Sequence, residues 1–126
     1  MSNQKFFSCK HCGNLIGLVV NKGVPLFCCG ENMTELVPNM VDASKEKHVP
    51  VVENTGDTLK VSVGSAPHPM EEAHQIMFIY VETENGGQRK SLKAGDEPSA
   101  VFVCVGDKPV AVYEYCNIHG LWKTKL

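Results

Sequence analysis

A short motif near the C-terminus, Cys116-Asn117-Ile118-His119, contains a cysteine and a histidine with two residues between them. Both side chains can bind one metal ion from a single tight turn, because thiolate and imidazole are common metal ligands. The other residues whose types and spacing suit this chemistry lie upstream. The chain contains six cysteines and five histidines: Cys9, Cys12, Cys28, Cys29, Cys104, Cys116, His11, His48, His68, His74 and His119.

Two cysteine pairs near the N-terminus form a first group. Cys9 and Cys12 belong to a C-x-x-C turn closed by glycine, and the adjacent pair Cys28 and Cys29 also precedes a glycine. Four thiolates from two turns predict a tetrahedral site for zinc or a single iron ion. A disulfide or buried free thiols would be the plainer interpretation, but two pairs backed by glycine disfavour it. Because the second pair is adjacent, we expect a distorted tetrahedron.

Four histidines and one cysteine form a second group, and all lie at predicted loops or strand ends: His48, His68, His74, Cys116 and His119. A single histidine is more often a surface or core residue than a ligand. Together the five indicate a five-coordinate iron with imidazoles in a plane and sulfur on the axis, because zinc prefers four ligands. A type-1 copper site would need an axial methionine, such as Met70 or Met77. We interpret both methionines as core residues instead.

The segments that must position these groups are mainly β. Residues 1–36 are predicted to form a small metal-stabilised domain, since so short a segment buries little apolar surface without its ion. Inside it, residues 15–20 and 24–27 are predicted to pair as a hairpin. Six further segments have the pattern of short strands: 49–53, 59–63, 76–81, 89–92, 100–105 and 110–115. Their spacing predicts an immunoglobulin-like β-sandwich over residues 37–126, with loops gathered at its two ends.

Composition limits the classes of function. The chain has 126 residues, 43% hydrophobic and 21% charged, with a net charge of -2, so we expect no nucleic-acid or membrane partner. The first seven residues lack the apolar segment of a signal peptide, and no apolar run is long enough to span a bilayer. In a chain without a signal peptide, we expect the cysteines to stay reduced in the cytoplasm and to serve as metal ligands.

These motifs resemble those of the desulfoferrodoxin family, the two-iron form of superoxide reductase. The match covers the whole chain and rests on four sequence features: C-K-H-C-G with C-C-G, E-K-H-V-P, A-P-H-P-M-E-E-A-H and Y-C-N-I-H-G-L-W. The resemblance implies a desulforedoxin-like N-terminal domain with one rubredoxin-type iron on the four cysteines. It also implies that the sandwich holds a catalytic iron on the four histidines and Cys116.

The family resemblance also implies an activity and partners. The reaction would be one-electron reduction of superoxide to hydrogen peroxide, with rubredoxin or a similar protein as electron donor, in a cytoplasmic homodimer. Glu46 would place its carboxylate at the open position of the ferric site. Lys47, beside ligand His48, offers a positive charge to an anionic substrate on a negatively charged chain.

The predicted chemistry agrees with the residues themselves. Five protein ligands leave the sixth position of an iron ion open to a small anion. A thiolate opposite that position would push electron density onto the bound oxygen species, as in haem–thiolate enzymes. We expect the turn to aim the backbone N–H groups of Ile118 and His119 at the sulfur. The competing functions are a non-catalytic iron protein that only transfers electrons and a zinc-stabilised structural or binding module.

Overall fold

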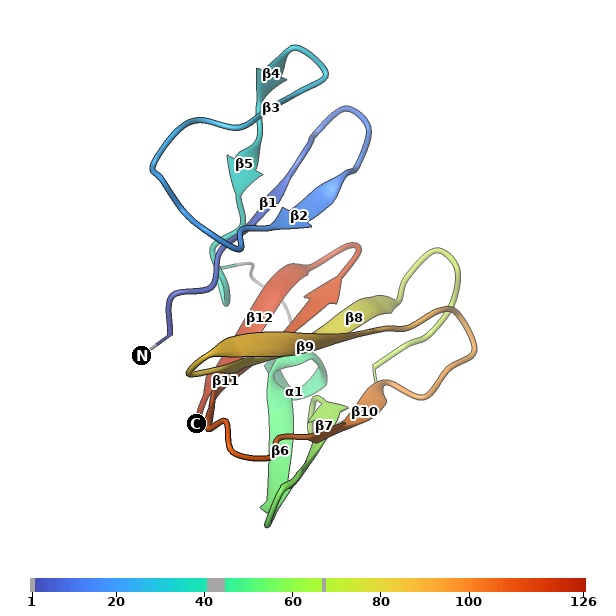
Figure 1. Cartoon of the computed structure of the whole chain (residues 1–126). Helices are drawn as coiled ribbons and strands as arrows, with labels where there is room; N and C mark the ends of the chain where they lie inside the picture. Colours follow the sequence, from blue (N-terminus) through green and yellow to red (C-terminus); the bar gives the residue numbers. More distant parts are fainter. Residues whose placement is uncertain (1, 41–44, 67) are drawn as a thin grey trace. The chain divides into compact units, whose positions relative to one another are not determined.

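The computed structural model describes residues 2–40, 45–66 and 68–126, and these form two compact units (Figure 1). The smaller unit is Asn3–Val37. The larger unit comprises the described residues from Pro38 to Leu126 together with Ser2. Strands predominate in both, which confirms the predicted mainly β fold. No helix in the described ranges is long and apolar enough to cross a membrane.

The smaller unit consists of five very short strands, β1 to β5. Their bounds are Phe6–Ser8, Leu15–Gly17, Phe27–Cys28, Glu31–Asn32 and Thr34–Glu35. β1 pairs antiparallel with β2 and β5, and β3 pairs with β4. The predicted hairpin of residues 15–20 with 24–27 is therefore wrong. Each cysteine turn reverses the chain directly, so the strand after the turn pairs with the strand before it.

Very little of the smaller unit is buried. Across Asn3–Val37, Phe6 and Cys9 are the only residues whose side chains are buried. Two buried side chains cannot offset the conformational entropy of about thirty-five ordered residues, at roughly 1 to 2 kcal/mol per residue. The unit therefore needs another source of stability, such as a bound metal ion.

The larger unit has one short helix, α1 (Lys45–His48), followed by seven strands, β6 to β12. The strands are Pro50–Thr55, Thr58–Val63, Ile76–Thr83, Gly86–Ser91, Ser99–Val103, Pro109–Cys116 and Gly120–Lys125. They form two antiparallel sheets, with orders β10-β7-β6 and β12-β11-β8-β9. All six predicted strands occur, with ends shifted by at most three residues. β12 was not predicted, because its sequence mixes two lysines with its apolar residues.

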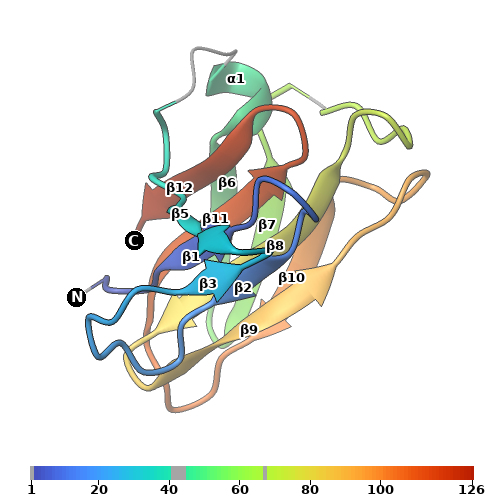
Figure 2. The same cartoon turned by 90° about the horizontal axis from the view of Figure 1, so that it is seen from above.

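The hydrophobic core lies between the two sheets of the larger unit, which form the separate layers visible in Figure 1. Both sheets contribute buried side chains: Leu59, Val61, Val63, Ile76, Ile79, Val81, Phe102, Val112 and Cys116. This arrangement is the predicted sandwich. Cys116 is the member that ends β11, so one edge of the core reaches the loops that follow. Figure 2 shows α1, the β7–β8 loop and the β11–β12 turn gathered at that end.

A β-bulge interrupts the pairing of β8 with β11 next to Cys116. Tyr115 pairs with Phe78, whereas Cys116 pairs with Ile76, so Met77 is an extra residue on β8. Bulges turn side chains away from the regular alternation and often occur beside functional sites. Met77 is 45% exposed as a result, and its interpretation as a core residue is wrong.

Candidate metal centres

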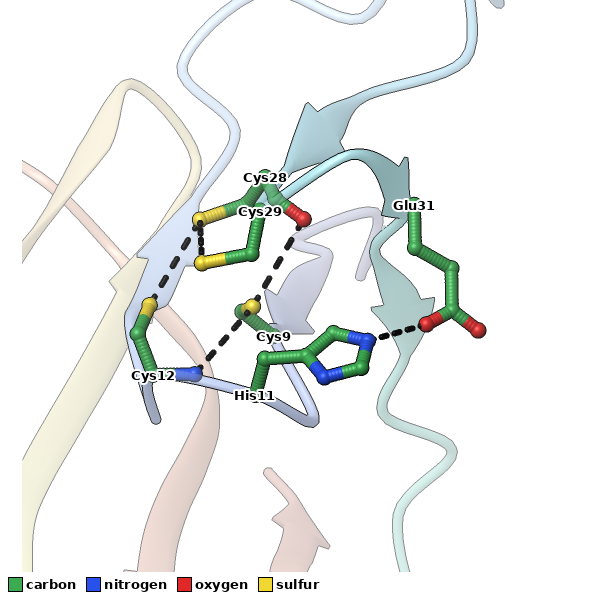
Figure 3. A network of polar contacts seen from close by, with 6 residues as sticks. All are labelled: Cys9, His11, Cys12, Cys28, Cys29 and Glu31. Atoms are coloured by element: carbon green, nitrogen blue, oxygen red, sulfur yellow. Dashed lines mark hydrogen bonds and ion pairs between the residues drawn. The ribbon is translucent and has the colours of Figure 1, made fainter.

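The four N-terminal cysteines come together in the smaller unit, as Figure 3 shows. Their sulfur atoms all lie within 4.8 Å of one another. Cys12 Sγ is 3.5 Å from Cys28 Sγ, which in turn is 4.0 Å from Cys29 Sγ. A tetrahedral ion with metal–sulfur bonds of about 2.3 Å would space its sulfurs by roughly 3.8 Å. The four sulfurs therefore fit a single tetrahedral ion.

The backbone explains how two adjacent cysteines can serve one ion. Cys29 has a φ of 54°, in the left-handed region that non-glycine residues rarely adopt, and Gly30 follows with a φ of 74°. This turn brings both sulfur atoms to the same side of the chain. Backbone amides support the opposite pair: Cys12 N–H donates to Cys9 Sγ (3.5 Å), and Asn14 N–H donates to Cys12 Sγ (3.4 Å).

The protonation of the four cysteines depends on their mutual contacts. The hydrogen bond from the Cys12 backbone lowers the pKa of Cys9 to about 6. Contact with the Cys12 sulfur is the main factor that raises the pKa of Cys29 to about 12. A cation bound by the four sulfurs would stabilise all four thiolates together.

A contact between an imidazole and a carboxylate lies outside the four sulfurs. His11, inside the first cysteine turn, contacts the carboxylate of Glu31 directly after the second turn through its Nε2 (Figure 3). Both side chains are about half exposed. The contact joins the two cysteine turns on their outer side. Sequence reasoning assigned neither residue a role, because nothing in their spacing indicates that they meet.

The second predicted group also comes together, at the end of the larger unit. His48 is the last residue of α1, His68 and His74 lie between β7 and β8, and Cys116 ends β11 directly before the turn with His119. One donor atom from each of the five lies within 4.8 Å of the others. Residues separated by up to 71 positions thus converge on one point. Together with the four-cysteine group, they form the two predicted metal sites.

The four imidazoles form a closed ring. Their centroids are 4.7 Å apart for His48 and His68, 4.8 Å for His68 and His74, 5.0 Å for His74 and His119, and 4.8 Å for His119 and His48. Each ring meets its two neighbours edge to face, at 75–86°. The four imidazoles, in this cyclic order, would hold one ion together, and Cys116 would supply a fifth donor.

The nitrogen positions pass a test of fit for a metal ion. His48 Nε2 is 3.1 Å from His68 Nε2 and 3.0 Å from His119 Nδ1. Two donors at right angles around an ion, with bonds of about 2.1 Å, are about 3 Å apart. His74 Nε2 is buried and has no hydrogen-bond partner in the described part of the chain. A buried nitrogen without a partner is costly, and an ion bound by the ring would satisfy it.

His68 is prepared to bind a metal as a neutral imidazole. Its Nδ1 lies 2.7 Å from the carbonyl oxygen of Pro69, which can only accept, so Nδ1 carries the proton and Nε2 keeps its lone pair. Burial, with smaller contributions from the three neighbouring imidazoles, lowers the pKa of His68 to about 4, against the opposing effect of the Pro69 hydrogen bond. At neutral pH His68 therefore needs to lose no proton before it binds an ion.

Opposing effects act on the thiol of Cys116. Burial raises its pKa, whereas backbone N–H groups of His119 and Ile118 lower it by hydrogen bonding to the sulfur. The His119 amide lies 3.4 Å from Sγ. These are the two amides that the sequence predicted for this turn. They stabilise negative charge on a sulfur that has no access to water.

Two buried side chains around this site were not assigned to it by sequence reasoning. Trp122 stacks on His48, with ring centroids 5.0 Å apart and an angle of 22°, and its indole N–H donates to the carbonyl of His119 (3.1 Å). Glu114 is fully buried, and no described residue hydrogen-bonds its carboxyl oxygens. Burial raises the pKa of Glu114 well above its usual range. Glu114 lies two residues before Cys116, on the core-facing side of β11. The alternation of side chains along a strand could therefore have predicted that Glu114 is buried near Cys116.

The remaining predicted site residues lie beside the five donors in the chain. Lys47 is exposed and directly precedes His48 in α1. The side chain of Glu46 lies outside the described residues. Met70 packs against the hydrophobic core, and its sulfur accepts a hydrogen bond from Ile76 N–H (3.4 Å), as expected of a core residue rather than a copper ligand.

Comparisons with known proteins agree with these two sites. The family model described as desulfoferrodoxin matches residues 40–125. A desulfoferrodoxin of Nitratidesulfovibrio vulgaris is 46% identical over 126 residues, covering 99% of both chains. A superoxide reductase of Pyrococcus horikoshii is 38% identical over 103 residues, which cover 68% of this chain and 90% of the relative.

Solved structures give the same picture. The crystal structure of the superoxide reductase from Treponema pallidum has a TM-score of 0.82 at 36% identity and covers 98% of this chain and all of its own. A superoxide reductase (1Fe-SOR) from Giardia intestinalis has a TM-score of 0.57 at 31% identity, covering 65% of this chain and 98% of its own. With a family model and a near full-length relative in agreement, the chain belongs to the desulfoferrodoxin family.

Proposed function

We propose that this protein is a superoxide reductase that converts superoxide to hydrogen peroxide at the five-donor site. The observation that carries the proposal is the closed ring of four imidazoles with one buried cysteine beside it. Five protein donors leave one position of a six-coordinate ion free for a small anion. Relatives and structural neighbours named superoxide reductase support the same activity.

The residues of the site have separable tasks in this reaction. Superoxide takes up one electron and two protons to become hydrogen peroxide, and iron held by the five donors would supply the electron. His68 binds as a neutral donor, since its Nδ1 carries the proton and its Nε2 keeps the lone pair. Cys116 contributes a soft, electron-rich sulfur whose charge two backbone amides moderate. Trp122 limits the motion of His48 and His119 by contacting both.

Lys47 and Glu46 are proposed to act on the substrate and on the oxidised site. The exposed ammonium of Lys47 would draw superoxide toward the site, because the chain as a whole is negatively charged. The carboxylate of Glu46 would move into the free position once product has left. Both proposals rest on the position of these residues next to His48 in the sequence.

The four-cysteine site is proposed to hold a second, rubredoxin-type iron in a domain of residues 1–36, with the catalytic domain at 37–126. Exposure of Cys12 and Cys29 gives an electron donor such as rubredoxin close access to that site. All six cysteines lie in the described part of the chain and all are free, which supports a cytoplasmic location. Exposed apolar side chains on the smaller unit support a homodimer: Val19, Val20, Val24 and Phe27.

Metal analysis with a visible spectrum tests the proposed function, followed by a superoxide assay. We expect two irons per chain, rubredoxin-like bands from the four-cysteine site and a broad thiolate-to-iron band from the five-donor site. The reduced protein should consume superoxide and release hydrogen peroxide in equal amounts. An electron carrier would show the bands without consuming superoxide, and a zinc-stabilised module would show neither band.

A further inference from the structure

The side chain of Asn117 bridges the Cys116–His119 turn to the loop that carries His74. Its Oδ1 accepts a hydrogen bond from the backbone N–H of Gln75 (2.9 Å), and its Nδ2 donates to the backbone carbonyl of Ala73 (3.1 Å). The backbone N–H of Asn117 also donates to the carbonyl of Gln75 (3.2 Å). These bonds attach to the chain on both sides of His74.

Within the described part of the chain, the other hydrogen bonds of residues 71–75 join atoms of the loop itself. Glu71 and His74 exchange two backbone hydrogen bonds, of 3.0 and 3.1 Å, in an isolated bridge outside the named strands. The side chain of Gln75 donates to the carbonyl of Glu72 (3.2 Å). This small turn is thus internally closed, and Asn117 supplies the side-chain hydrogen bonds that fix it to the rest of the site.

The ring of His74 depends on its backbone for orientation. Its Nε2 has no hydrogen-bond partner among the described residues, and its ring contacts are edge-to-face contacts with His68 and His119. His68, by contrast, is oriented by its bond to the Pro69 carbonyl, and His119 follows Cys116 in the same turn. Anything that moves the backbone of residues 73–75 therefore moves the donor nitrogen of His74.

We propose that Asn117 is a positioning residue that holds His74 in register with Cys116 and His119, so that three of the five donors behave as one rigid unit. This inference rests on the proposed iron site. An asparagine amide suits the role because it offers a donor and an acceptor in one plane, like a peptide group, and so continues the pairing of two backbone segments. Aspartate keeps the acceptor and lacks the donor, and alanine lacks both.

Loss of these bonds should act on iron retention rather than on folding. Residues that orient metal ligands typically change metal affinity by about ten- to a hundredfold when they are replaced. We expect Asn117→Ala to release iron from the five-donor site at least about tenfold faster than the parent protein. Asn117→Asp should also release it faster, because its second oxygen would face the Ala73 carbonyl without a proton to share.

The test follows iron loss from the two-iron protein to a ferrous-ion chelator. The reduced protein is incubated with the chelator, and portions are reoxidised before each spectrum, because both bands belong to ferric iron. The broad thiolate-to-iron band then reports the five-donor site, and the rubredoxin-like bands report the four-cysteine site of the same molecule as an internal reference. Asn85→Ala is the matched control, since Asn85 also hydrogen-bonds across two loops, through Asp107 (3.1 Å), at the opposite ends of β8 and β11. The expected result is faster loss in both Asn117 variants, with unchanged rubredoxin-like bands and an unchanged Asn85→Ala protein.

Two results would overturn the positioning role. One is parent-like iron retention in both Asn117 variants. The other is equally accelerated loss from both sites, or in Asn85→Ala, which would indicate general loosening of the fold. If Asn117→Ala does not fold, Asn117→Asp decides between these results. A parent protein that holds iron but does not reduce superoxide would instead overturn the proposed function. The rates of iron loss would still decide whether Asn117 positions His74.

Discussion

At the residue scale, Cys116 is the donor that we expect to affect both the binding of iron and its reactivity toward superoxide. It is fully buried at the end of β11, so no water competes for its sulfur. Its pKa is raised by burial and lowered by the amides of His119 and Ile118. An adjacent cation favours the thiolate further. Cys116 is therefore expected to carry its full charge only when the ion is bound.

Replacing Cys116 by serine should abolish superoxide reduction and leave the sandwich folded. Serine has nearly the same size, but its oxygen is a harder and weaker donor, so iron is held less tightly and the electron-rich sulfur is lost. Stopped-flow measurement of superoxide consumption, with iron content and the thiolate-to-iron band, checks this. Cys104→Ser is the control, because Cys104 lies in neither donor group. A Cys116→Ser protein that keeps its iron and the parent rate would contradict this role.

Lys47 should control how fast superoxide reaches the site. Removing its exposed charge in Lys47→Ala should slow the bimolecular step by roughly tenfold and flatten its dependence on ionic strength. Lys47→Arg should keep most of the rate, because charge matters more than fork geometry for a diatomic anion. Pulse radiolysis across a salt series measures both effects.

Lys45→Ala provides the control for this experiment. It removes an equal charge from α1, three residues from His48 rather than one. We expect a smaller loss of rate in Lys45→Ala than in Lys47→Ala. Equal effects would mean that net charge alone matters, and an unchanged Lys47→Ala protein would make this lysine an ordinary solvated charge.

The donors of both sites could be predicted from residue type and spacing, whereas the residues that support them could not. His48, His68 and His74 are recognisable because histidines are rare and each was predicted to lie in a loop or at a strand end; the structure places His48 at the end of α1. The roles of Trp122 and Asn117 depend on contacts with residues in other segments, such as His48 and Ala73. Such contacts exist only after the chain has folded, so no local sequence pattern predicts them.

At the element scale, the sandwich positions the five-donor site through strand ends and one bulge. β8 and β11 run side by side to the site, and the extra residue Met77 changes the register just before Cys116. A sequence pattern of alternating residues predicts strands but not such a shift, because a bulge is a property of the pair. The same limit explains why the hairpin predicted in the smaller unit is wrong. Periodicity shows that segments are extended, but it does not show which segments pair.

The register of β10 gives a direct test of the sandwich. Phe102 is 1% exposed within the core, whereas its neighbour Val103 is 58% exposed on the opposite face. Phe102→Ala should lower the free energy of unfolding by about 3 to 5 kcal/mol through lost burial and a cavity. Val103→Ala should change it by less than about 0.5 kcal/mol. Denaturant unfolding of both variants measures the contrast, and comparable losses would mean that β10 has another register.

At the scale of the whole molecule, the two metal sites belong to different compact units. All four sulfur donors of the first site lie in Asn3–Val37, and all five donors of the second lie in the larger unit. The smaller unit buries only Phe6 and Cys9 among its side chains, while the larger has a continuous core. Stability in the smaller unit should therefore depend on its metal far more than stability in the larger one.

Cys28→Ser should separate the two sites functionally. Losing one of four sulfurs should abolish the rubredoxin-like bands and loosen the smaller unit, because that unit has little core to replace the metal. Superoxide reduction should persist near the parent rate when a chemical reductant supplies the electrons, since no donor of the second site lies before His48. The visible spectrum, iron content and stopped-flow kinetics measure these outcomes on one sample, with Cys104→Ser again as the control. A Cys28→Ser protein that keeps its second iron and is nonetheless inactive would show that the four-cysteine site takes part in the reaction itself.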